Sequence, residues 1–530
     1  MLPGRRAVES LSTGLASARV LASSGVVRPI SPVTLTRVAW TLRTWGLGPA
    51  GGFRAVALRY PDRAALVDEI GTLTYDQLHR RSNALARALR QRGVREGDAV
   101  AILCRNHRGF VEATLAVAKL GADALYLNTS FAAPQLSSVL EREKAALLVH
   151  DEEFAGLVDF PVRVLAWSDS PSPEPTLDSL IASASEADLR PPGRRSRTVI
   201  LTSGTTGAPK GAARSEAGIG AAVSMLSRLP LRDGWTTHIA APLFHTWGFA
   251  HLAFAMLLGS TVVLTRGFDP ETCLEVTQDF GCESLVVIPV MLQRILRLPE
   301  ATLAAYDLSA VRVVASSGSA LPGDLAWSWM DRFGDRLYNV YGSTEVAYAS
   351  IATPEDLRAA PTSAGRPPLG TVVRILDASG RTLPAGGSGR IFVGNSLLFE
   401  GYTGGGGKQV VQGLMSTGDV GRFDTDGRLY VEGRDDEMIV SGGENVFPQV
   451  VEDCLVRHPQ VVEAAAIGVP DPDFGQRLRA FVVTAGPVGE AELRRWVKEH
   501  LSGYQAPRDF VFVDELPRNA TGKVVKRDLG

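Results

Sequence analysis

The chain has 530 residues, which is too long for a single hydrophobic core and therefore predicts two or more domains. Hydrophobic residues make up 45% of the sequence and charged residues 21%, as in an ordinary globular protein. The formal net charge of −2 provides no concentrated basic surface, so nucleic acid is not expected as a partner.

Residues 1–50 form an N-terminal extension to which the sequence assigns no role. Glu9 and several arginines and serines interrupt the first part, where a signal peptide needs a continuous apolar segment. A helix is expected at residues 34–47, with apolar residues at helical spacing. These apolar residues are Leu35, Val38, Leu42 and Trp45. We expect this helix to pack against the body of the protein, and a peripheral membrane contact is the alternative.

Between about residues 64 and 320, short apolar segments alternate with amphipathic helical segments. A hairpin is expected around Gly71, and a helix from Tyr75 to Arg92 follows it. Further strands are expected at 99–103, 124–127, 198–201, 285–289 and 311–316, and a helix at 110–120. Strands and helices in this order predict a parallel sheet that is covered by helices on both faces.

Beyond Gly365 the pattern changes to short strands that are separated by turns, among them a hairpin turn at Asp426-Gly427. A small mixed unit of strands and helices is expected after Gly433. The strands of these two regions are expected at 372–376, 389–393, 428–431, 464–468 and 479–483, and the helices at 448–457 and 490–501.

The four cysteines, Cys104, Cys273, Cys282 and Cys454, are scattered along the chain. They form no CxxC pair and no metal-ligand spacing, so neither a disulfide framework nor a zinc site is expected. The sequence also lacks a run of eighteen or more apolar residues, the length that a membrane-spanning helix requires. These features predict a cytoplasmic protein, with membrane association only through the N-terminal extension.

A loop rich in glycine and hydroxyl groups lies between Leu201 and Gly211, directly after an apolar strand. Its backbone N–H groups and hydroxyls can donate to a phosphate, and Lys210 adds a positive charge. Taken alone, the same composition also fits a flexible linker. A P-loop of the Walker type is not expected, because Pro209 precedes the lysine and a glycine follows it.

Four further motifs follow this loop in the chain. They are Tyr341-Gly342-Ser343-Thr344-Glu345, Ser416-Thr417-Gly418-Asp419, Gly433-Arg434-Asp435-Asp436 and Arg518-Asn519-Ala520-Thr521-Gly522-Lys523. In this order and spacing the motifs resemble the adenylate-forming superfamily of acyl-CoA synthetases, luciferases and peptide-synthetase adenylation domains. The resemblance extends from about Tyr60 to the C-terminus and is closest to fatty acyl-CoA synthetases.

The resemblance implies an α/β fold with two domains. A large N-terminal domain of stacked mixed sheets with helices and a small barrel-like β part is expected at residues 51–433. A small, mobile α+β domain is expected at 434–530, with a hinge near Asp436. The implied reaction has two steps: a carboxylate attacks the α-phosphate of ATP, and the thiol of coenzyme A then displaces AMP. The implied substrates and cofactors are a small carboxylic acid, ATP, Mg²⁺ and coenzyme A, whereas the oligomeric state stays open.

The resemblance also implies roles at the nucleotide. The ATP or AMP contacts are expected from Thr202, Ser203, Gly204, Thr205, Thr206, Gly207, Lys210, Ser317, Gly318, Ser319, Ala320, Asn339, Tyr341, Gly342, Ser343, Asp419 and Arg434. Thr344 is expected to donate to the α-phosphate, and Glu345 and Thr206 are expected to bind Mg²⁺. Asp419 is the expected ligand of the ribose hydroxyls, since one carboxylate can accept from both.

The C-terminal domain is expected to serve the two steps in turn. Lys523 would bridge the carboxylate and the α-phosphate during adenylation. Rotation about Asp436 would then bring a different segment to the site, where glycines leave room for the pantetheine arm of coenzyme A. This segment comprises Ser441, Gly442, Gly443 and Glu444.

The acyl pocket is expected around the motif that begins at Pro242. His245 would line the channel between the carboxylate and the thiol, and the pocket residues would be His245, Trp247, Phe249, Val287, Gly318 and Gly342. Peptide-synthetase domains carry an aspartate in this motif, and its absence disfavours an amino acid. The apolar lining favours an unbranched medium- or long-chain fatty acid. An aryl acid or a sterol side-chain acid, and transfer to a carrier protein in place of coenzyme A, are the alternatives.

Overall fold

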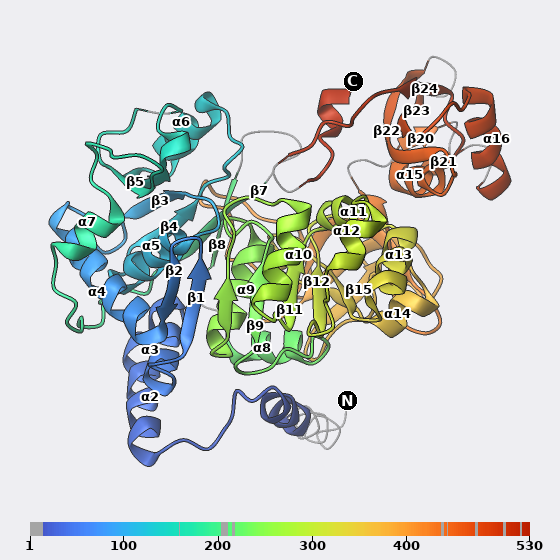
Figure 1. Ribbon diagram of the computed structural model, residues 1–530. Helices are drawn as coiled ribbons and strands as arrows, with labels where there is room; N and C mark the ends of the chain where they lie inside the picture. Colours follow the sequence, from blue (N-terminus) through green and yellow to red (C-terminus); the bar gives the residue numbers. More distant parts are fainter. Residues whose placement is uncertain are drawn as a thin grey trace.

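The computed structural model describes residues 14–529 apart from Val158 and the segments 203–209, 215–217, 436–438, 442–443, 472–474, 502–504 and 520–521. The side chains of Thr202, 440–441, 444–445 and Gly475 are also outside the description. Among these residues the strands form four sheets, and the fold is mixed α/β (Figure 1).

The first sheet has six strands in the order β6-β5-β3-β4-β7-β8, all parallel except for the antiparallel edge strand β8. Its strands are β3 (Ala99–Leu103), β4 (Asp123–Tyr126), β5 (Ala145–Asp151), β6 (Arg163–Trp167), β7 (Thr198–Thr202) and β8 (Lys210–Arg214). Because β7 and β8 pair directly, the two ends of the glycine-rich loop meet at the edge of this sheet.

The second sheet has eight strands in the order β14-β13-β12-β11-β9-β10-β1-β2. Its strands are β1 (Ala64–Asp68), β2 (Gly71–Thr74), β9 (Thr236–Ile239), β10 (Thr261–Val263), β11 (Ser284–Val287), β12 (Val313–Ser316), β13 (Leu337–Tyr341) and β14 (Ser350–Ala352). The central strands are parallel and the two edge strands are antiparallel to their neighbours. The strand that the sequence predicts up to Pro289 ends at Val287, because Pro289 begins the following helix.

Helices cover both sheets. They are α3 (Pro49–Arg59), α4 (Tyr75–Gln91), α5 (Arg108–Lys119), α6 (Ala133–Arg142), α7 (Leu177–Ala182), α8 (Ile219–Leu226), α9 (Thr246–Leu257), α10 (Pro270–Asp279), α11 (Pro289–Leu296), α12 (Glu300–Ala305), α13 (Gly323–Phe333) and α14 (Pro354–Ala359). The helix predicted at 75–92 begins after a capping box in which Thr74 and Gln77 satisfy each other's backbone N–H groups. The helix α5 is buried along its whole length.

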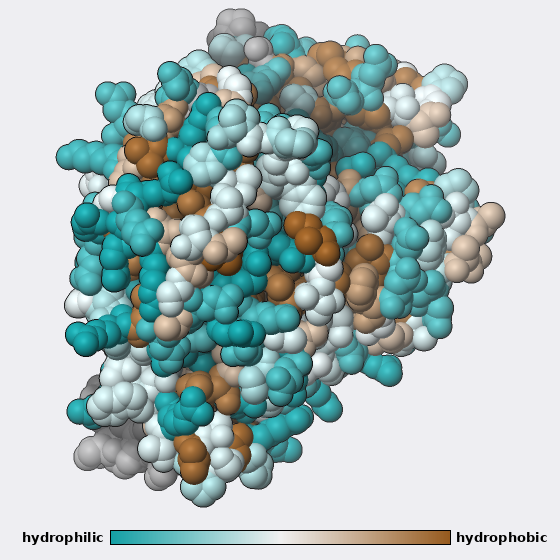
Figure 2. All heavy atoms as spheres, turned by 60° about the vertical axis from the view of Figure 1, so that its left-hand side comes forward, coloured by the Kyte–Doolittle hydropathy of each residue, from teal (hydrophilic) through white to brown (hydrophobic). Residues whose placement is uncertain are grey.

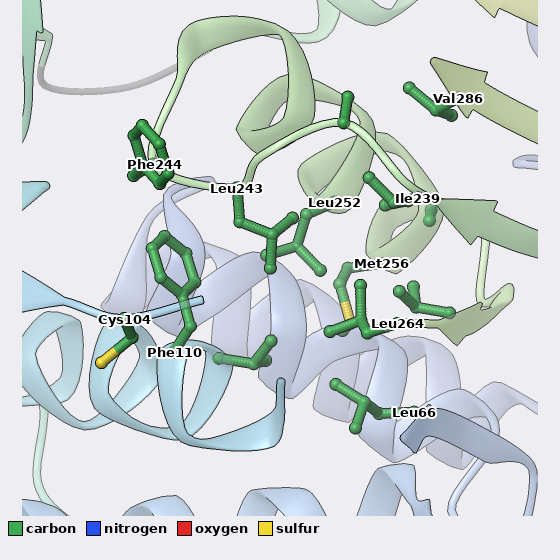
Figure 3. Close-up of a cluster of buried hydrophobic side chains, with 14 of the residues drawn as sticks. Leu66, Cys104, Phe110, Ile239, Leu243, Phe244, Leu252, Met256, Leu264 and Val286 are labelled. Carbon is green, nitrogen blue, oxygen red and sulfur yellow. The ribbon is translucent and has the colours of Figure 1, made fainter. Parts of the chain in front are cut away.

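The core lies between the two sheets, around α5 and α9. Phe110 on α5 packs against Tyr126 of the first sheet, with ring centroids 4.8 Å apart. Leu252 and Met256 on α9 belong to the same buried cluster as Leu66 of the second sheet (Figure 3). Phe249 on α9 also packs against Tyr126, with ring centroids 5.0 Å apart, and α5 contacts β1, so both helices contact both sheets.

Three buried groups that the sequence separates meet at the start of α5. Cys104, His107 and Asp151 place their ligand atoms within 4.8 Å of one another. Their polar atoms are engaged in hydrogen bonds: His107 Nε2 lies 2.8 Å from Asp151, and the N–H of Gly109 donates to His107 Nδ1 at 3.1 Å. This cluster has the character of a helix cap that stabilises the turn from β3 into α5.

The third sheet is antiparallel and joins β15-β16-β18-β17, with β19 paired to β18. Its strands are β15 (Val372–Leu376), β16 (Gly389–Gly394), β17 (Val410–Val411), β18 (Leu414–Phe423) and β19 (Leu429–Arg434). The predicted turn at Asp426-Gly427 connects β18 to β19, and Gly427 takes a φ of +77° there. The register of this pair places Asp419 directly opposite Arg434.

The C-terminal sheet has the order β21-β20-β23-β22, with β24 added beside β23. It comprises β20 (Ile439–Ser441), β21 (Glu444–Val446), β22 (Val461–Asp471), β23 (Gly475–Thr484) and β24 (Asp509–Phe512), with α15 (Pro448–Val456) and α16 (Glu490–His500). Figure 1 shows this unit above the main body, whereas the last residues return over the body. It has its own hydrophobic core.

The N-terminal extension contains helical residues 14–23 and the helix α2 (Pro32–Trp45). Packing against the body, the role favoured by the sequence, is observed for α2: it lies on α3, and Thr41 and Trp45 are buried. Within the described part of the chain, every helix is too short or too polar to traverse a bilayer. A peripheral membrane contact stays a prediction, which sedimentation with anionic vesicles would test.

Candidate active site

A cavity of about 1240 Å³ joins most of the predicted site residues. At one end it is lined by Lys210, Thr344, Glu345, Asp419 and Lys523, and at the other by apolar residues of α2, α3 and α9. The cavity is larger than the usual volume of roughly 300 to 1,000 Å³ for a single small-molecule site. One continuous space therefore connects a charged end to an apolar end.

A buried carboxylate marks the charged end. The Tyr341 hydroxyl donates to Asp419 Oδ2 at 2.5 Å, and Arg434 Nη1 lies 3.6 Å from Asp419 Oδ1. Burial raises the pKa of the Asp419 carboxyl, while the hydrogen bond from Tyr341 and the charges of Arg434 and Lys523 oppose this shift. Burial, and then the Asp419 charge, raise the pKa of Tyr341 well above its usual range, so its phenol stays a donor.

A second carboxylate, that of Glu345, lines the same end of the cavity. Glu345 is 8% exposed and accepts a hydrogen bond of 2.7 Å from the Tyr402 hydroxyl. The Lys210 ammonium lies over the Tyr402 ring, 5.2 Å from its centroid. The Arg214 guanidinium donates to the Thr344 carbonyl, and burial lowers its pKa to about 10 although Glu345 opposes this. Lys210, Thr344 and Glu345 thus surround one polar region.

The C-terminal motif enters the same end of the cavity. Lys523 is exposed to the cavity, and its backbone N–H donates to Asn519 Oδ1 at 3.0 Å. Gly522 has a φ of +72°, and a Cβ atom there would lie 2.3 Å from Val290 Cγ1 at the start of α11. Only glycine allows the loop to approach α11 so closely and with this backbone conformation.

We predict that Gly522→Ala lowers the rate of adenylation about tenfold, because the added methyl group pushes the loop, and Lys523 with it, away from α11. Acid-dependent pyrophosphate release would measure this. The matched second change is Val290→Ala, which removes the clashing Cγ1 atom and is expected to restore part of the rate in the double variant, because the positive φ at residue 522 still strains an alanine. A double variant as slow as Gly522→Ala would show that this contact is not the cause.

Another interdomain contact lies next to this loop. Glu463 on β22 accepts hydrogen bonds from Arg518 at 2.7 Å and from Arg297, which follows α11, at 3.3 Å. Arg297 of the main body thus pairs with Glu463 of the C-terminal unit, and Arg518 of the same unit shares this carboxylate.

The start of α9 separates the charged end from the apolar end. His245 occupies the N-cap position of this helix without a capping hydrogen bond from its side chain, and burial lowers the pKa of its imidazole to about 4, so it is neutral at pH 7. The Thr246 hydroxyl lies 3.5 Å from that of Thr344. Trp247 and Phe249 also line the cavity. The Val287 side chain is fully buried in β11 and does not line the cavity, although its carbonyl accepts from Trp247 Nε1 at 2.9 Å.

The remaining predicted residues fall into three groups. Ser317, Gly318, Gly342 and Ser343 line the cavity. A Cβ atom at Gly342 would lie 2.2 Å from the Ala347 carbonyl oxygen, so this position has room only for glycine. The other three residues are not part of the cavity wall. Ser319 and Ala320 follow Gly318 in the sequence, and Asn339 lies on β13. Residues 203–207, Asp436, Gly442 and Gly443, and the side chains of Thr202, Ser441 and Glu444, lie outside the described residues.

Two matches to family models decide what kind of protein this is. A model described as AMP-binding enzyme matches residues 53–403, and one described as AMP-binding enzyme C-terminal domain matches residues 450–523. The chain belongs to the AMP-binding enzyme family. This AMP-binding enzyme is an adenylate-forming protein with an α/β fold, as the resemblance of its motifs implies.

Individual relatives of this AMP-binding enzyme agree in fold but differ in substrate. Feruloyl-CoA synthase from an Amycolatopsis species is 34% identical over 498 residues, which cover 92% of this chain and 99% of the relative. The fatty acid–acyl-carrier-protein ligase ScoC of Streptomyces coeruleorubidus is 30% identical, with 88% of this chain and 93% of the relative covered. The structure of an anthranilate CoA ligase in complex with anthranoyl-AMP superposes with a TM-score of 0.82 and 26% identity, covering 91% of this chain and 96% of that one.

This AMP-binding enzyme therefore activates a carboxylic acid with ATP to an acyl-adenylate and is of the acid–CoA ligase type. The chemistry requires charge neutralisation around phosphate and precise orientation rather than an acid–base pair. The charged end of the cavity offers both, because Lys210, Arg434 and Lys523 converge there.

Three residues of this AMP-binding enzyme that sequence reasoning did not select also face the charged end: Arg214, Tyr402 and Lys408. A Cβ atom at Gly418 would lie 3.3 Å from Lys408 Nζ and 3.4 Å from Arg434 Nη2, so this glycine makes room for both cations. The lysine follows four consecutive glycines, which was the one available signal in the sequence. Arg214 and Tyr402 carried no local signal, because only the packing of β8 brings them to Glu345.

Proposed function

We propose that the acid which this enzyme activates is an unbranched fatty acid of medium or long chain, and that the product is its CoA thioester. The observation that carries this proposal is the course of the cavity along α9. Most residues between Thr246 and Leu257 line it, and this range has a length of about 18 Å at a rise of about 1.5 Å per residue. An extended alkyl chain advances about 1.3 Å per carbon–carbon bond, so roughly fourteen carbon atoms span this distance.

The lining of this part of the cavity supports an alkyl chain. Its walls are mainly apolar, and apolar burial stabilises each methylene group by about 0.8 kcal/mol. The neutral His245 stands at the point where the chain would meet the nucleotide. A neutral imidazole carries no charge at this point of the chain.

At the charged end we propose that Asp419 binds the ribose hydroxyls, with Arg434 beside it. Thr344 would donate to the α-phosphate, and Lys210 would contact the outer phosphates together with the glycine-rich loop. Glu345 is suited to Mg²⁺, because it presents a hard, buried carboxylate next to a hydroxyl and a phosphate-binding lysine. When bound, Mg²⁺ would neutralise charge on the phosphate oxygens.

Lys523 would hold the carboxylate and the α-phosphate together in the first step. Its ammonium lies close enough to Asp419 to oppose the pKa shift of that carboxyl, as expected of a cation at the nucleotide. We further propose that residues 434–530 act as a mobile domain that turns about Asp436 after adenylation. This turn would withdraw Lys523 and bring the segment 441–444 to the thiol of coenzyme A.

The proposal is tested by acyl-CoA formation, with AMP and pyrophosphate release, across C2 to C20 fatty acids, aryl acids and a sterol acid, each with and without coenzyme A. We expect kcat/KM to rise with chain length up to about C12 or beyond, roughly three- to fourfold per methylene group, as apolar burial predicts. A maximum on an aryl or sterol acid would contradict the fatty-acid assignment.

Two alternatives have specific support, one for the acid and one for the acceptor. An aryl acid is favoured by the 34% identical feruloyl-CoA synthase and by Gly318 in the cavity wall, which leaves room for a flat ring. Transfer to a carrier protein is favoured by the 30% identical fatty acid–acyl-carrier-protein ligase. In the same assay, pyrophosphate release without thioester formation from coenzyme A would support the carrier protein.

A further inference from the structure

The N-terminal extension is fixed to the body of the protein, although the family match begins only after it. The N–H of Asp233 donates to the Ser24 carbonyl at 2.8 Å, and Arg28 pairs with the Asp233 carboxylate at 2.9 Å. Near the end of α2, Arg195 donates to the Thr44 carbonyl at 2.9 Å. The segment between these contacts is therefore held in place at both ends and forms a defined wall.

This segment closes the apolar end of the cavity. Its apolar wall includes Leu21, Val26 and Ile30 on one side and Leu35, Val38 and Leu42 on the other, and Arg28 lines the same part of the cavity. The three residues of α2 are three and four positions apart and so share one face of the helix. Five of the six are half-buried, whereas Leu35 is 56% exposed. Leu35 is thus the most exposed of these six lining residues.

The outer surface agrees with this arrangement. Figure 2, in which the side that carries α2 is turned forward, shows apolar atoms among polar ones at the lower end of the molecule, the level of α2 in Figure 1. Val33 and Trp40 are exposed there and do not line the cavity. Only one face of α2 is thus turned toward the cavity, which lets that face be tested separately.

We propose that the extension is part of the substrate site: the methyl-terminal part of a long, unbranched alkyl chain binds between α2 and residues 21–30. The extension then determines the longest chain that the enzyme uses well. This inference rests on the proposed fatty-acid function and deepens it, because it assigns the far part of the chain to residues outside the family match. The carboxylate end, near Thr344 and Lys523, binds in the same way for short and long acids.

The experiment compares C8 and C16 acids with the full-length enzyme and its variants. Val38→Trp and Leu42→Trp place an indole in the far end of the cavity. The matched control is Thr36→Trp, at an exposed position of α2 that does not line the cavity. We expect kcat/KM for C16 to fall about 50-fold in the first two variants, as when roughly three methylene groups lose their burial, and to change less than about twofold for C8.

Turnover of C8 shows that each variant is folded, so a selective loss of C16 reports on the cavity. Equal ratios of C16 to C8 activity in the wild type, the two cavity variants and the control would overturn the inference while the fatty-acid function stands. A wild type that converts only ring acids would overturn both. A variant that loses C8 as well would be replaced by Val38→Phe or Leu42→Phe, and an unchanged ratio there would also overturn the inference.

Discussion

Lys523→Ala is expected to lower the rate of acyl-adenylate formation about 10²- to 10³-fold, the usual effect of removing one preorganised charge-stabilising group. Lys523 lies at the charged end of the cavity with Asp419 and Arg434. Without its ammonium, a carboxylate would have to approach a negatively charged phosphate with one cation fewer. The measurement is acid-dependent pyrophosphate release in the absence of coenzyme A.

The second half-reaction supplies the internal control. Thioester formation from supplied acyl-adenylate and coenzyme A is expected to stay within about threefold of the wild type, because the proposed rotation removes Lys523 from the site before this step. Lys523→Arg keeps the charge but changes the shape of the donor, and we expect an intermediate rate. Equal losses in both half-reactions would contradict the assignment of Lys523 to adenylation alone.

Asp419→Ala is expected to lower kcat/KM for ATP about 10²- to 10³-fold. The carboxylate would accept hydrogen bonds from two ribose hydroxyls, and a bond to a charged group contributes about 1.5 to 3 kcal/mol. The change also leaves the Tyr341 hydroxyl, now 2.5 Å from Asp419, without its acceptor. Steady-state kinetics with ATP as the varied substrate would measure the loss.

A modified nucleotide separates the ribose contact from general damage. The wild type is expected to use 2′-deoxy-ATP about 10- to 100-fold less well than ATP, because one of the two hydroxyl contacts is missing. Asp419→Ala should use the two nucleotides almost equally. A variant that still prefers ATP by the wild-type factor would show that another group binds the ribose.

The motifs predict the chemical type of the site better than they predict the residues that surround it. Tyr341, Glu345, Asp419 and Lys523 stand out because glycines, hydroxyls and charges accompany them in fixed patterns. Arg214 is not part of such a pattern. It reaches the Thr344 carbonyl only because β8 pairs with β7 and turns this side chain toward Glu345, a relation that no local pattern records.

The elements show the same division. The helix at Tyr75–Gln91 was predicted closely, because its capping box and apolar face are local properties of the sequence. From the sequence, Val287 is expected in the acyl pocket because it is apolar, like the other residues expected there. In the fold this residue is the last of the buried strand β11, and its side chain does not line the cavity. Strand neighbours alternate between two faces, and only the packed sheet decides which face a cavity meets.

By itself, the sequence determined the chemistry of this protein: the order of its phosphate-binding, ribose and lysine motifs indicates an adenylate-forming enzyme, and its apolar periodicity indicates the sheets and helices that carry them. The tertiary structure decided which of these residues share a space and how far that space extends. The cavity is built from segments as distant as residues 21–42, α9 and Lys523, and contacts over such separations depend on packing rather than on local pattern.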